Sequence, residues 1–559
     1  MVNEQSSSMN KIFSWLMSHK EVVVLLGCTV LFLLLIFKDP FSERTLIPNF
    51  EPYPDTLFYI VKPLNFLKGE GFNFSREGRL AYNLTPPLYS IALIPFFAIN
   101  PDPRMAYFAN IFLSLISVGL FFLIVKKITN NIWLTCLVLF LYITNYFLYF
   151  MPTLVMAENL ILPLYLTAVF LLIRNNTPAF FILLGVLSVC IYATKGANVP
   201  ISAMILILSA IKIVISQSKN TLKIKSFSYL LVGFSVSFIL YSLFFYYVTN
   251  SNILGPLLEY FGLAKEAITP KADEITAAAS AGGWISFSYA SKNFPLYLSS
   301  LLGDSQRFLW DNTPLVPKYI AFLSLAGLIL GVITKRFRFL SVSLILMIVS
   351  SIGFLLTFYA FDARYIYIAI PSLLIGFSIL IASLFNLFKA VKYKRIIFLM
   401  IILFFGFYVF NNALRIKNQI SLNLKYAETP WYYISVLKLN EYFTDDKVID
   451  GKKPVVISAL PPFLVDFYSN GNYTLLPLSY EQEFRSAKEI TWGPNDYTDL
   501  PKLYTKYIKE GYDVYVSRYG LGNEVYTNRD FEIIMKEFQL DLVWPGCYEQ
   551  CNIYTVGLK

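Results

Sequence analysis

Residues 104–125 read RMAYFANIFLSLISVGLFFLIV, and this stretch decides the class of fold. After Arg104 it contains no charged residue. An apolar stretch of about 18 or more residues with few charges is long enough to cross a bilayer as a helix. Backbone groups in lipid must hydrogen-bond within the segment, so we expect helices. Similar stretches recur along the first three quarters of the chain, without the alternation of a membrane barrel.

The composition agrees with a protein that lies mostly in lipid. Of its 559 residues 56% are hydrophobic and only 15% are charged, and the mean hydropathy is +0.56. A soluble domain carries about 25% charged residues. We therefore predict an α-helical polytopic membrane protein with about eleven spans. They lie near residues 21–38, 104–125, 131–149, 158–173, 178–194, 199–215, 227–249, 318–334, 339–359, 364–388 and 395–413.

The basic residues between these spans predict the topology. If residues 1–20 are cytoplasmic, the loops on that side hold fourteen basic residues and no acidic residue. This follows the rule that short cytoplasmic loops are rich in Lys and Arg. The membrane domain is then 21–413, and the loops 39–103 and 250–317 and the tail 414–559 are extracytoplasmic. The basic segments are Lys126/Lys127, Arg174, Lys212 to Lys225, Lys335/Arg336/Arg338 and Lys389 to Arg395.

The net charge of +10 does not indicate a nucleic-acid partner. From Asn411 onward there are 16 Lys and Arg against 19 Asp and Glu, a net charge of −3. The positive charge therefore belongs to the membrane part, where it lies in short loops that set topology. We expect membrane lipid around the protein and no nucleic acid.

The tail has the pattern of a small extracytoplasmic α/β domain. Thr429-Pro430 starts a predicted helix through Tyr442, because proline is favoured at the first helical position. Short β-rich runs at 454–459 and 512–517 alternate with a helical run at 523–538, which indicates a small mixed sheet. Cys547 and Cys551 also lie here. Whether they form a disulfide stays open, although an oxidising space permits one.

The sequence gives little support to a Cys/His metal site. It contains five cysteines and one histidine, His19, which stands before the first apolar run. Such a site usually needs four ligands of these two types. The sequence therefore does not identify a cofactor. It is compatible with a divalent cation bound by carboxylates.

Charged residues at the predicted outer boundary of the membrane are the candidate site. The acids are Asp55, Glu158 and Asp362. The cations are Arg104, Lys195, Lys318 and Arg364, of which Lys195 opposes the topology rule most clearly. Charges at membrane depth are costly and mark functional sites. Cations at headgroup depth can bind a lipid phosphate and stabilise the charge that grows on it as it leaves. A carboxylate there can take a proton from an attacking hydroxyl.

Each of these residues also has a purely structural interpretation. Asp55 stands in a Pro-rich aromatic loop and can serve as a turn or cap residue. Glu158 can stabilise the start of a helix through the helix dipole. Arg364 can be an interfacial anchor. Lys195, in the short turn Thr194-Lys-Gly196, is the hardest to explain structurally. Two segments of the first outer loop, 57–67 and 88–99, are predicted to lie in the membrane interface.

The order of several motifs resembles the first-loop pattern of GT-C glycosyltransferases, of the protein O-mannosyltransferase and aminoarabinose transferase type. The matching residues are Asp55…Gly69-Glu-Gly-Phe72…Thr85-Pro-Pro-Leu-Tyr89…Arg104…Asn110, then Met156-Ala-Glu-Asn-Leu160. Thr194-Lys-Gly196 resembles the family's Thr-Arg-Gly, and Arg364-Tyr365 its Arg-Tyr. The pattern covers most of residues 1–415, and a C-terminal extramembrane domain fits the aminoarabinose transferase type.

The resemblance implies roles for individual residues. Asp55 matches the catalytic carboxylate of the first outer loop, and Glu158 is a second acid of the active site. Lys195, Arg364 and Tyr365 are implied in binding the donor phosphate. The pocket would be lined by Tyr82, Thr85 and Tyr89. The chain departs from the family where Thr56 replaces a frequent Glu and where Thr85 precedes Pro86-Pro87 in place of Lys or His. These departures leave the substrate and any metal requirement open.

The function expected from the resemblance is inverting transfer of a monosaccharide from a polyprenyl-phosphate donor to an acceptor protein, lipid or glycan. Two alternatives compete with it. A transporter or flippase of lipid-linked saccharides would place ionisable residues deep in broken helices. A non-enzymatic scaffold would not need acids and cations at one membrane boundary. In this chain nearly all charges stand at span ends, which favours the transferase.

Overall fold

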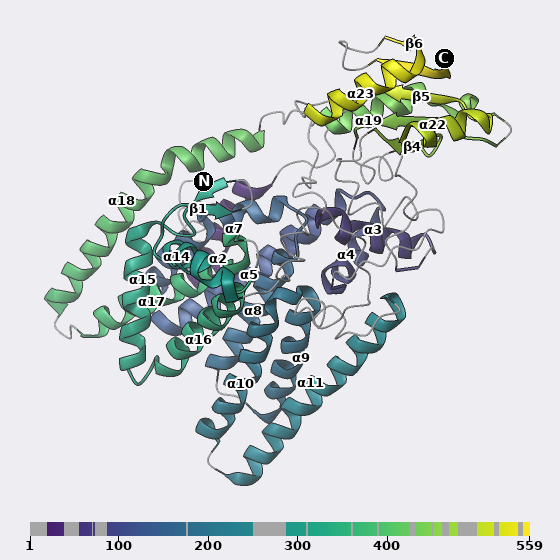
Figure 1. The fold of residues 1–559 in the computed structure, drawn as a ribbon. Coiled ribbons are helices and arrows are strands. Elements are labelled where there is room, and N and C mark those ends of the chain that lie inside the picture. Colours follow the sequence, from purple (N-terminus) through teal and green to yellow (C-terminus); the bar gives the residue numbers. More distant parts are fainter. Residues whose placement is uncertain are drawn as a thin grey trace, which may run out of the picture.

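The structure is a computed structural model of the full chain. It describes residues 20–37, 55–69, 71–72, 86–174, 177–217, 219–249, 287–308, 311–358, 361–387, 391–424, 431–449, 451–460, 469–478, 500–518, 525–545 and 552–559. Helices make up most of these residues, and a small sheet lies near the C-terminus (Figure 1).

Each of the eleven predicted spans overlaps a helix. In the described part of the chain, six helices are long and apolar enough to cross a membrane, or seven if one bent pair is counted as a single span, and four further apolar helices are shorter. The chain is therefore an integral membrane protein, and the span number of eleven stays a prediction. The helices that overlap the eleven predicted spans are α2 (Lys20–Ile36), α5 (Met105–Thr129), α6 (Ile132–Ile143), α7 (Tyr146–Phe150), α8 (Glu158–Ile173), α9 (Pro178–Thr194), α10 (Val199–Ser216), α11 (Asn220–Thr249), α15 (Lys318–Ile333), α16 (Arg338–Leu355), α17 (Ala369–Leu387) and α18 (Val391–Leu424).

The predicted span 131–149 is not one straight helix. The chain bends by 64° between α6 and the segment Tyr146–Thr153, which consists of α7 and the 3-10 turn η1 (Met151–Thr153). Asn145 stands at the break. Its side-chain oxygen accepts a hydrogen bond from the Phe147 N–H, while its amide donates to the Leu315 carbonyl at 2.8 Å. Asn thus provides an alternative to the helical hydrogen bonds of its neighbours.

Glycines allow two pairs of helices to pack backbone against backbone. A methyl group at Gly185 of α9 would overlap the Leu230 carbonyl of α11, and one at Gly233 of α11 would overlap the Ile182 carbonyl of α9. Gly327 of α15 faces Gly376 of α17 in the same way. Small residues at helix contacts permit such close approach in membranes, where lipid is as apolar as a leucine side chain.

Two helices of the predicted first outer loop, residues 39–103, form a separate packed layer. They are α3 (Asp55–Leu67) and α4 (Leu88–Ile99), which coincide with the predicted segments 57–67 and 88–99. Buried side chains of α3 and α4 pack with the start of α5 and with Val155 and Ala157, the residues before α8. The layer therefore covers the end of the bundle at which α8 begins. The predicted second outer loop, residues 250–317, contributes η3 (Phe287–Tyr289), α14 (Ala290–Leu301) and the hairpin of β1 (Gln306–Phe308) and β2 (Asp311–Thr313).

The chain after α18 contains a five-stranded mixed sheet of order β4-β3-β5-β7-β6. β3 is parallel to β4 and β5, whereas β7 is antiparallel to β5 and β6. In Figure 1 this sheet region lies beyond the end of the helical bundle that α3 and α4 cover. Its elements are α19 (Trp431–Tyr442), η5 (Asp445–Lys447), β3 (Val455–Ser458), β4 (Thr474–Pro477), α22 (Leu500–Lys509), β5 (Val514–Ser517), α23 (Val525–Glu537), β6 (Phe538–Trp544) and β7 (Ile553–Leu558).

The sequence prediction of this region was partial. The predicted runs 454–459 and 512–517 coincide with β3 and β5, and the two predicted helices coincide with α19 and α23. The prediction did not include β4, α22, β6 or β7. Helix α18 also extends to Leu424, beyond the predicted span end at 413. The domain boundaries stay a prediction.

The two ends of the helical bundle differ in charge. At one end, called the Lys212 end, basic residues from several predicted cytoplasmic loops gather. The Lys127 ammonium lies within electrostatic reach of Arg174 and Lys212, and the Arg336 guanidinium donates to the Lys127 carbonyl at 3.3 Å. The other end, called the Glu158 end, is where α8 and α10 begin and α9 ends.

Candidate active site

The backbone before Glu158 is irregular and is held in place by two buried asparagines. The amide of Asn110 donates to the carbonyls of Pro152 at 3.2 Å and Leu154 at 2.8 Å. The amide of Asn159 donates to the carbonyls of Met151, Leu154 and Met156 at 3.2, 2.8 and 3.2 Å. Non-helical backbone at membrane depth needs such partners because no water is there to supply them. The two amides thereby fix the position from which Glu158 starts α8.

The start of α3, in the loop 39–103, contacts the same segment. The Thr56 hydroxyl lies 3.4 Å from the Val155 carbonyl. Thr56 follows Asp55, the first residue of α3, so the start of α3 lies beside the chain that leads into Glu158. The Asp55 side chain itself lies outside the described residues. Tyr89 of α4 is fully buried, and its hydroxyl donates to the Asn110 side-chain oxygen at 2.6 Å.

Glu158 and Lys195 form a buried ion pair. The Lys195 ammonium meets the Glu158 carboxylate at 2.6 Å, and the two side chains are 18% and 4% exposed. Lys195 ends α9 in an extended conformation and leads into the 3-10 turn η2 (Gly196–Asn198). This conformation turns the chain from α9 into α10 and leaves Lys195 at the bundle end. Glu158 occupies the first position of α8, where the helix dipole favours a negative charge.

Arg364 approaches the pair from a third segment. It lies in the 3-10 turn η4 (Ala363–Ile366), just before α17 begins at Ala369. Asp362 caps this turn by accepting a hydrogen bond from the Arg364 N–H at 2.9 Å, and its carboxylate lies 3.6 Å from the Arg364 Nε. The side chains of Arg364 and Asp362 are 14% and 9% exposed. The turn thus presents the guanidinium in a largely desolvated position.

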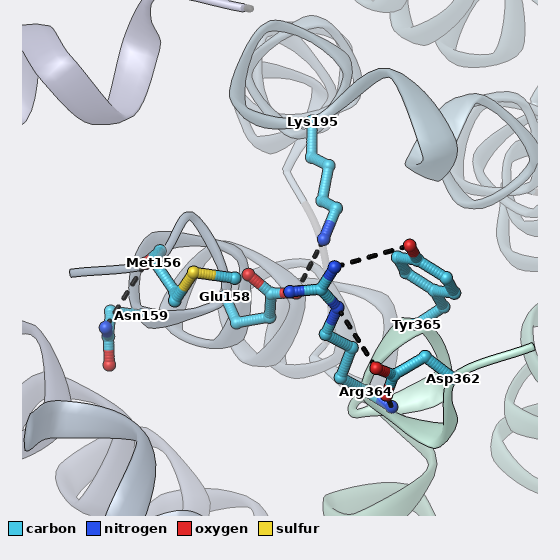
Figure 2. A network of polar contacts seen from close by, with 7 residues as sticks. All are labelled: Met156, Glu158, Asn159, Lys195, Asp362, Arg364 and Tyr365. Atoms are coloured by element: carbon cyan, nitrogen blue, oxygen red, sulfur yellow. Dashed lines mark hydrogen bonds and ion pairs between the residues drawn. The ribbon is translucent and has the colours of Figure 1, made fainter. Parts of the chain in front are cut away.

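Tyr365 connects the two cations. The Lys195 Nζ lies 5.0 Å and the Arg364 Cζ 5.1 Å from the centroid of its ring. These distances suit cation–π attraction, which draws a positive charge toward an aromatic face. The Tyr365 hydroxyl oxygen also lies 3.4 Å from an Arg364 Nη atom that donates to it. Figure 2 shows the charged groups of Lys195, Glu158 and Arg364 pointing toward one another beside this ring.

One of the two Glu158 carboxylate oxygens accepts no hydrogen bond from the described residues of the cluster. Glu158 Oε1 accepts the hydrogen bond from Lys195, whereas Glu158 Oε2 is buried and accepts none from the described residues. A buried carboxylate oxygen without a donor is energetically costly. The charges of both Lys195 and Arg364 act on the Glu158 carboxylate. A hydroxyl donor that entered here would therefore gain a strong, charge-assisted hydrogen bond.

A further buried cation lies on α3. The Lys62 side chain is 2% exposed, and desolvation lowers the pKa of its ammonium to about 7. An ammonium in this environment can change its protonation state near neutral pH.

The described residues do not bring together three or more His, Cys, Asp or Glu side chains that could hold a metal ion. The described cysteines, Cys28, Cys136 and Cys190, are free and lie in helices. Glu158 and Asp362 are the carboxylates nearest the cations, and each is already engaged with one of them.

The predicted site residues thus divide into two groups. The structure brings together Glu158, Lys195, Arg364 and Tyr365 and places Tyr89 in the supporting layer. Tyr82, Thr85, Cys547, Cys551 and the Asp55 side chain lie outside the described residues. Sequence reasoning gave no role to Asp362, Asn159 or Asn110. The Asp362-Ala-Arg364 spacing was the available signal for the first, since Asp often accepts a hydrogen bond from the backbone two residues on.

The fold and the charged cluster at one bundle end define a class. The chain has the fold of GT-C proteins. This agrees with the resemblance seen in the sequence. No family model and no curated protein sequence matches the chain.

Individual solved structures carry this likeness. ArnT from Cupriavidus metallidurans in the apo state is 11% identical, with 98% of each chain covered and a TM-score of 0.55. The same protein bound to undecaprenyl phosphate is also 11% identical, with 96% of this chain and 97% of that chain covered and a TM-score of 0.55. A third similar structure is the oligosaccharyltransferase AglB from Archaeoglobus fulgidus, in complex with an inhibitory peptide and a dolichol-phosphate. It is 13% identical, with 94% of this chain and 73% of that chain covered and a TM-score of 0.53.

Proposed function

We propose that the protein is an inverting glycosyltransferase that moves a monosaccharide from a polyprenyl-phosphate donor to an acceptor protein, lipid or glycan at the non-cytoplasmic side of the membrane. The observation that carries the proposal is the meeting of Lys195, Arg364 and Glu158 at one end of the helical bundle. A lipid-linked sugar presents its phosphate at this depth, where the membrane meets water. Structures of the same fold hold undecaprenyl phosphate and dolichol-phosphate, which supports this class of donor.

The chemistry follows from the charge that the donor phosphate gains. The acceptor hydroxyl attacks the anomeric carbon of the sugar, and the bond between this carbon and the phosphate oxygen breaks. The phosphate leaves with the electron pair of that bond, so its charge changes from −1 to −2. Lys195 and Arg364 stabilise the added charge, which is the kind of preorganised electrostatic stabilisation that lowers barriers most.

The two acids have different tasks in this proposal. Asp55 accepts the proton of the attacking hydroxyl, and an aspartate suffices because the oxocarbenium-like centre makes that hydroxyl more acidic. Glu158 holds the Lys195 ammonium with Oε1 and offers Oε2 to the acceptor or to the protonated base. The link between Thr56 and Val155 supports this division, because it brings the start of α3 next to Glu158.

The orientation in the membrane is part of the proposal. Basic residues gather at the Lys212 end, which by the positive-inside rule is cytoplasmic. The N-terminus is then cytoplasmic, and the Glu158 end, the loops 39–103 and 250–317 and the region 414–559 face the other side. Protease added outside intact cells or spheroplasts should cleave the C-terminal region, and protection of this region would contradict the orientation.

Transfer itself is tested in cells that carry or lack the gene. Mass spectrometry of surface glycoproteins, glycolipids and glycans should show one hexose- or pentose-sized addition only where the gene is present. Complementation with Asp55→Asn serves as the matched control, because the substitution keeps the shape of the side chain and removes its charge. Equal modification by Asp55→Asn and wild type would reject the assigned base.

A second assay, with purified protein, separates the transferase from a flippase. A flippase would move the lipid-linked sugar across the membrane with its phosphate bond intact. Purified protein in detergent, without any membrane barrier, would then release no polyprenyl phosphate from the donor. Release of polyprenyl phosphate that depends on added acceptor supports transfer.

A further inference from the structure

The sheet region near the C-terminus contains a cavity that the proposed transfer does not use. It has a volume of about 570 Å³ and is formed between α23, β6 and the ends of β5 and β7. This size lies within the range of about 300–1,000 Å³ that is usual for small-molecule sites. All its walls come from residues 518–559, whereas the charged cluster of the candidate active site comes from residues 158–365. The lining residues are Arg518, Phe531, Met535, Phe538, Gln539, Leu540, Tyr554 and Lys559.

The cavity has one cationic wall. Arg518 directly follows β5, and its backbone N–H donates to the Asn552 carbonyl at 3.1 Å, which fixes its position. Its guanidinium lies 5.2 Å from the centroid of the Phe531 ring. The Arg518 Nε is buried and has no hydrogen-bond partner among the described residues. A buried donor of a charged group is costly to leave unpaired, and an oxyanion would satisfy it.

The second basic residue of the cavity is already engaged. The Lys559 ammonium donates to the carbonyls of Met535 at 3.1 Å and Lys536 at 2.5 Å, which are among the last carbonyls of α23. These carbonyls have no partner within the helix, and a lysine satisfies them well. Lys559 therefore closes one side of the cavity, and the unpaired donor belongs to Arg518.

The remaining walls are aromatic or aliphatic. The Phe531 and Tyr554 rings lie 6.3 Å apart and are tilted by 55°, and Phe538 is buried beside them. Asn552 donates to the Tyr554 hydroxyl at 3.2 Å, so this ring is also held in place. Met535 is 46% exposed and stands where the cavity opens. A flexible thioether at such a position adapts to apolar groups of different shape.

We propose that this cavity binds a small ligand in which an oxyanion, a phosphate or a carboxylate, is attached to an apolar ring. The oxyanion accepts hydrogen bonds from the Arg518 guanidinium, including its buried Nε. The ring packs against the aromatic wall formed by Tyr554, Phe531 and Phe538 and extends toward Met535. The site is independent of the transfer reaction, because it shares no residue with the charged cluster at the Glu158 end.

Calorimetric titration of the full chain in detergent micelles tests the proposal with phenyl phosphate as the probe. Phenol and inorganic phosphate are the two halves of this probe. Phenyl phosphate should bind at least about tenfold more tightly than either half, since a charge-assisted hydrogen bond and ring burial each contribute that much. Benzoate in a parallel titration shows whether the site prefers the planar carboxylate or the phosphate. Binding of neither probe would overturn the proposal.

Three variants assign the binding to this cavity. Arg518→Gln should weaken phenyl phosphate binding at least about tenfold. Met535→Trp should block the cavity while the charge is kept, so it tests the site even if Arg518→Gln is poorly folded. Arg529→Gln is the matched control, because Arg529 lies on α23, the helix that carries Met535, but does not line the cavity. Unchanged binding in both Arg518→Gln and Met535→Trp, or loss only in Arg364→Gln, would place the probe elsewhere and reject the site.

Discussion

Lys195 and Lys212 are lysines of the helical bundle with little or no exposure, but different groups satisfy their ammonium ions. At the Glu158 end, Lys195 pairs with a carboxylate at 2.6 Å and lies beside an aromatic ring. At the Lys212 end, Lys212 is 8% exposed and donates to three main-chain carbonyls at the end of α8, those of Leu171, Leu172 and Arg174. The same residue type therefore meets a titratable side-chain partner at one end and main-chain partners at the other.

The difference separates a structural cation from a functional one. An ammonium has three donors, and Lys212 uses them on carbonyls at the C-terminal end of α8, where a helix cannot pair all its own carbonyls. Lys195 instead holds a carboxylate whose second oxygen accepts no hydrogen bond from the described residues. A phosphate can compete with Glu158 for Lys195, but nothing can replace Lys212 without leaving backbone carbonyls unpaired. The comparison predicts that mutations at the two ends have different consequences.

The largest effect is expected for Asp55→Asn. If Asp55 is the base at the Glu158 end, the turnover number should fall by about 10³-fold, within the range for loss of general-base catalysis. The measurement is acceptor-dependent release of polyprenyl phosphate from the purified protein. Donor binding should stay within a few-fold of wild type. Turnover near the wild-type level would show that Asp55 at the Glu158 end is not the catalytic base.

Arg364→Gln and Lys195→Gln should have the next largest effect. Loss of one group that stabilises the leaving phosphate should lower kcat/KM by about 10²-fold, as for other preorganised donors. Arg364→Lys is the matched control, because it keeps the charge but loses the planar, forked donor set. Wild-type kinetics in both Gln variants would mean that the donor phosphate binds elsewhere.

The double variant Glu158→Gln/Lys195→Gln sharpens the distinction between stability and function. Lys195→Gln alone leaves Glu158 buried without its partner, which costs about 3–5 kcal/mol when a buried ion pair is broken on one side. Removal of both charges should restore the melting temperature, because no unpaired charge remains. Transfer should not recover. Recovery of both properties would show that Lys195 serves only to neutralise Glu158.

The smallest effect on transfer is expected for Lys212→Met. The apolar replacement leaves the carbonyls at the end of α8 unpaired, so the protein should lose about 1–3 kcal/mol of stability. Turnover per folded molecule should stay near that of wild type, because Lys212 lies at the other end of the bundle. A thermal unfolding scan in detergent, run beside the transfer assay, checks both statements. A selective loss of turnover without destabilisation would contradict the comparison.

The membrane part of the fold was largely predictable from hydropathy. Apolar length alone gave helices at the observed places, because a helix is the only structure that satisfies its backbone within a single lipid-embedded segment. The same rule could not show the bend between α6 and α7. That bend depends on the contact of Asn145 with Leu315, a residue far away in the sequence.

The sequence indicated which charged residues belong to the candidate site, but not which of them pair with one another. Cations against the positive-inside trend singled out Lys195 and Arg364. That Lys195 would pair with Glu158 depends on how α8 and α9 pack, which no local pattern contains. The strands β6 and β7 escaped prediction for a similar reason, because their antiparallel pairing is set by register between two chain segments and not by either alone.

The close contact between α9 and α11 has a consequence for how this sequence can vary. Gly185 and Gly233 each lie against a main-chain carbonyl of the opposite helix, so even an alanine at either position would require the two backbones to separate. Because α9 ends at Thr194, directly before Lys195, such a separation would also shift the lysine away from Glu158. Single substitutions at these two glycines are therefore not expected to be tolerated, although neither residue is proposed to contact a substrate. Related chains should differ freely on the lipid-facing side of α11 long before they differ here.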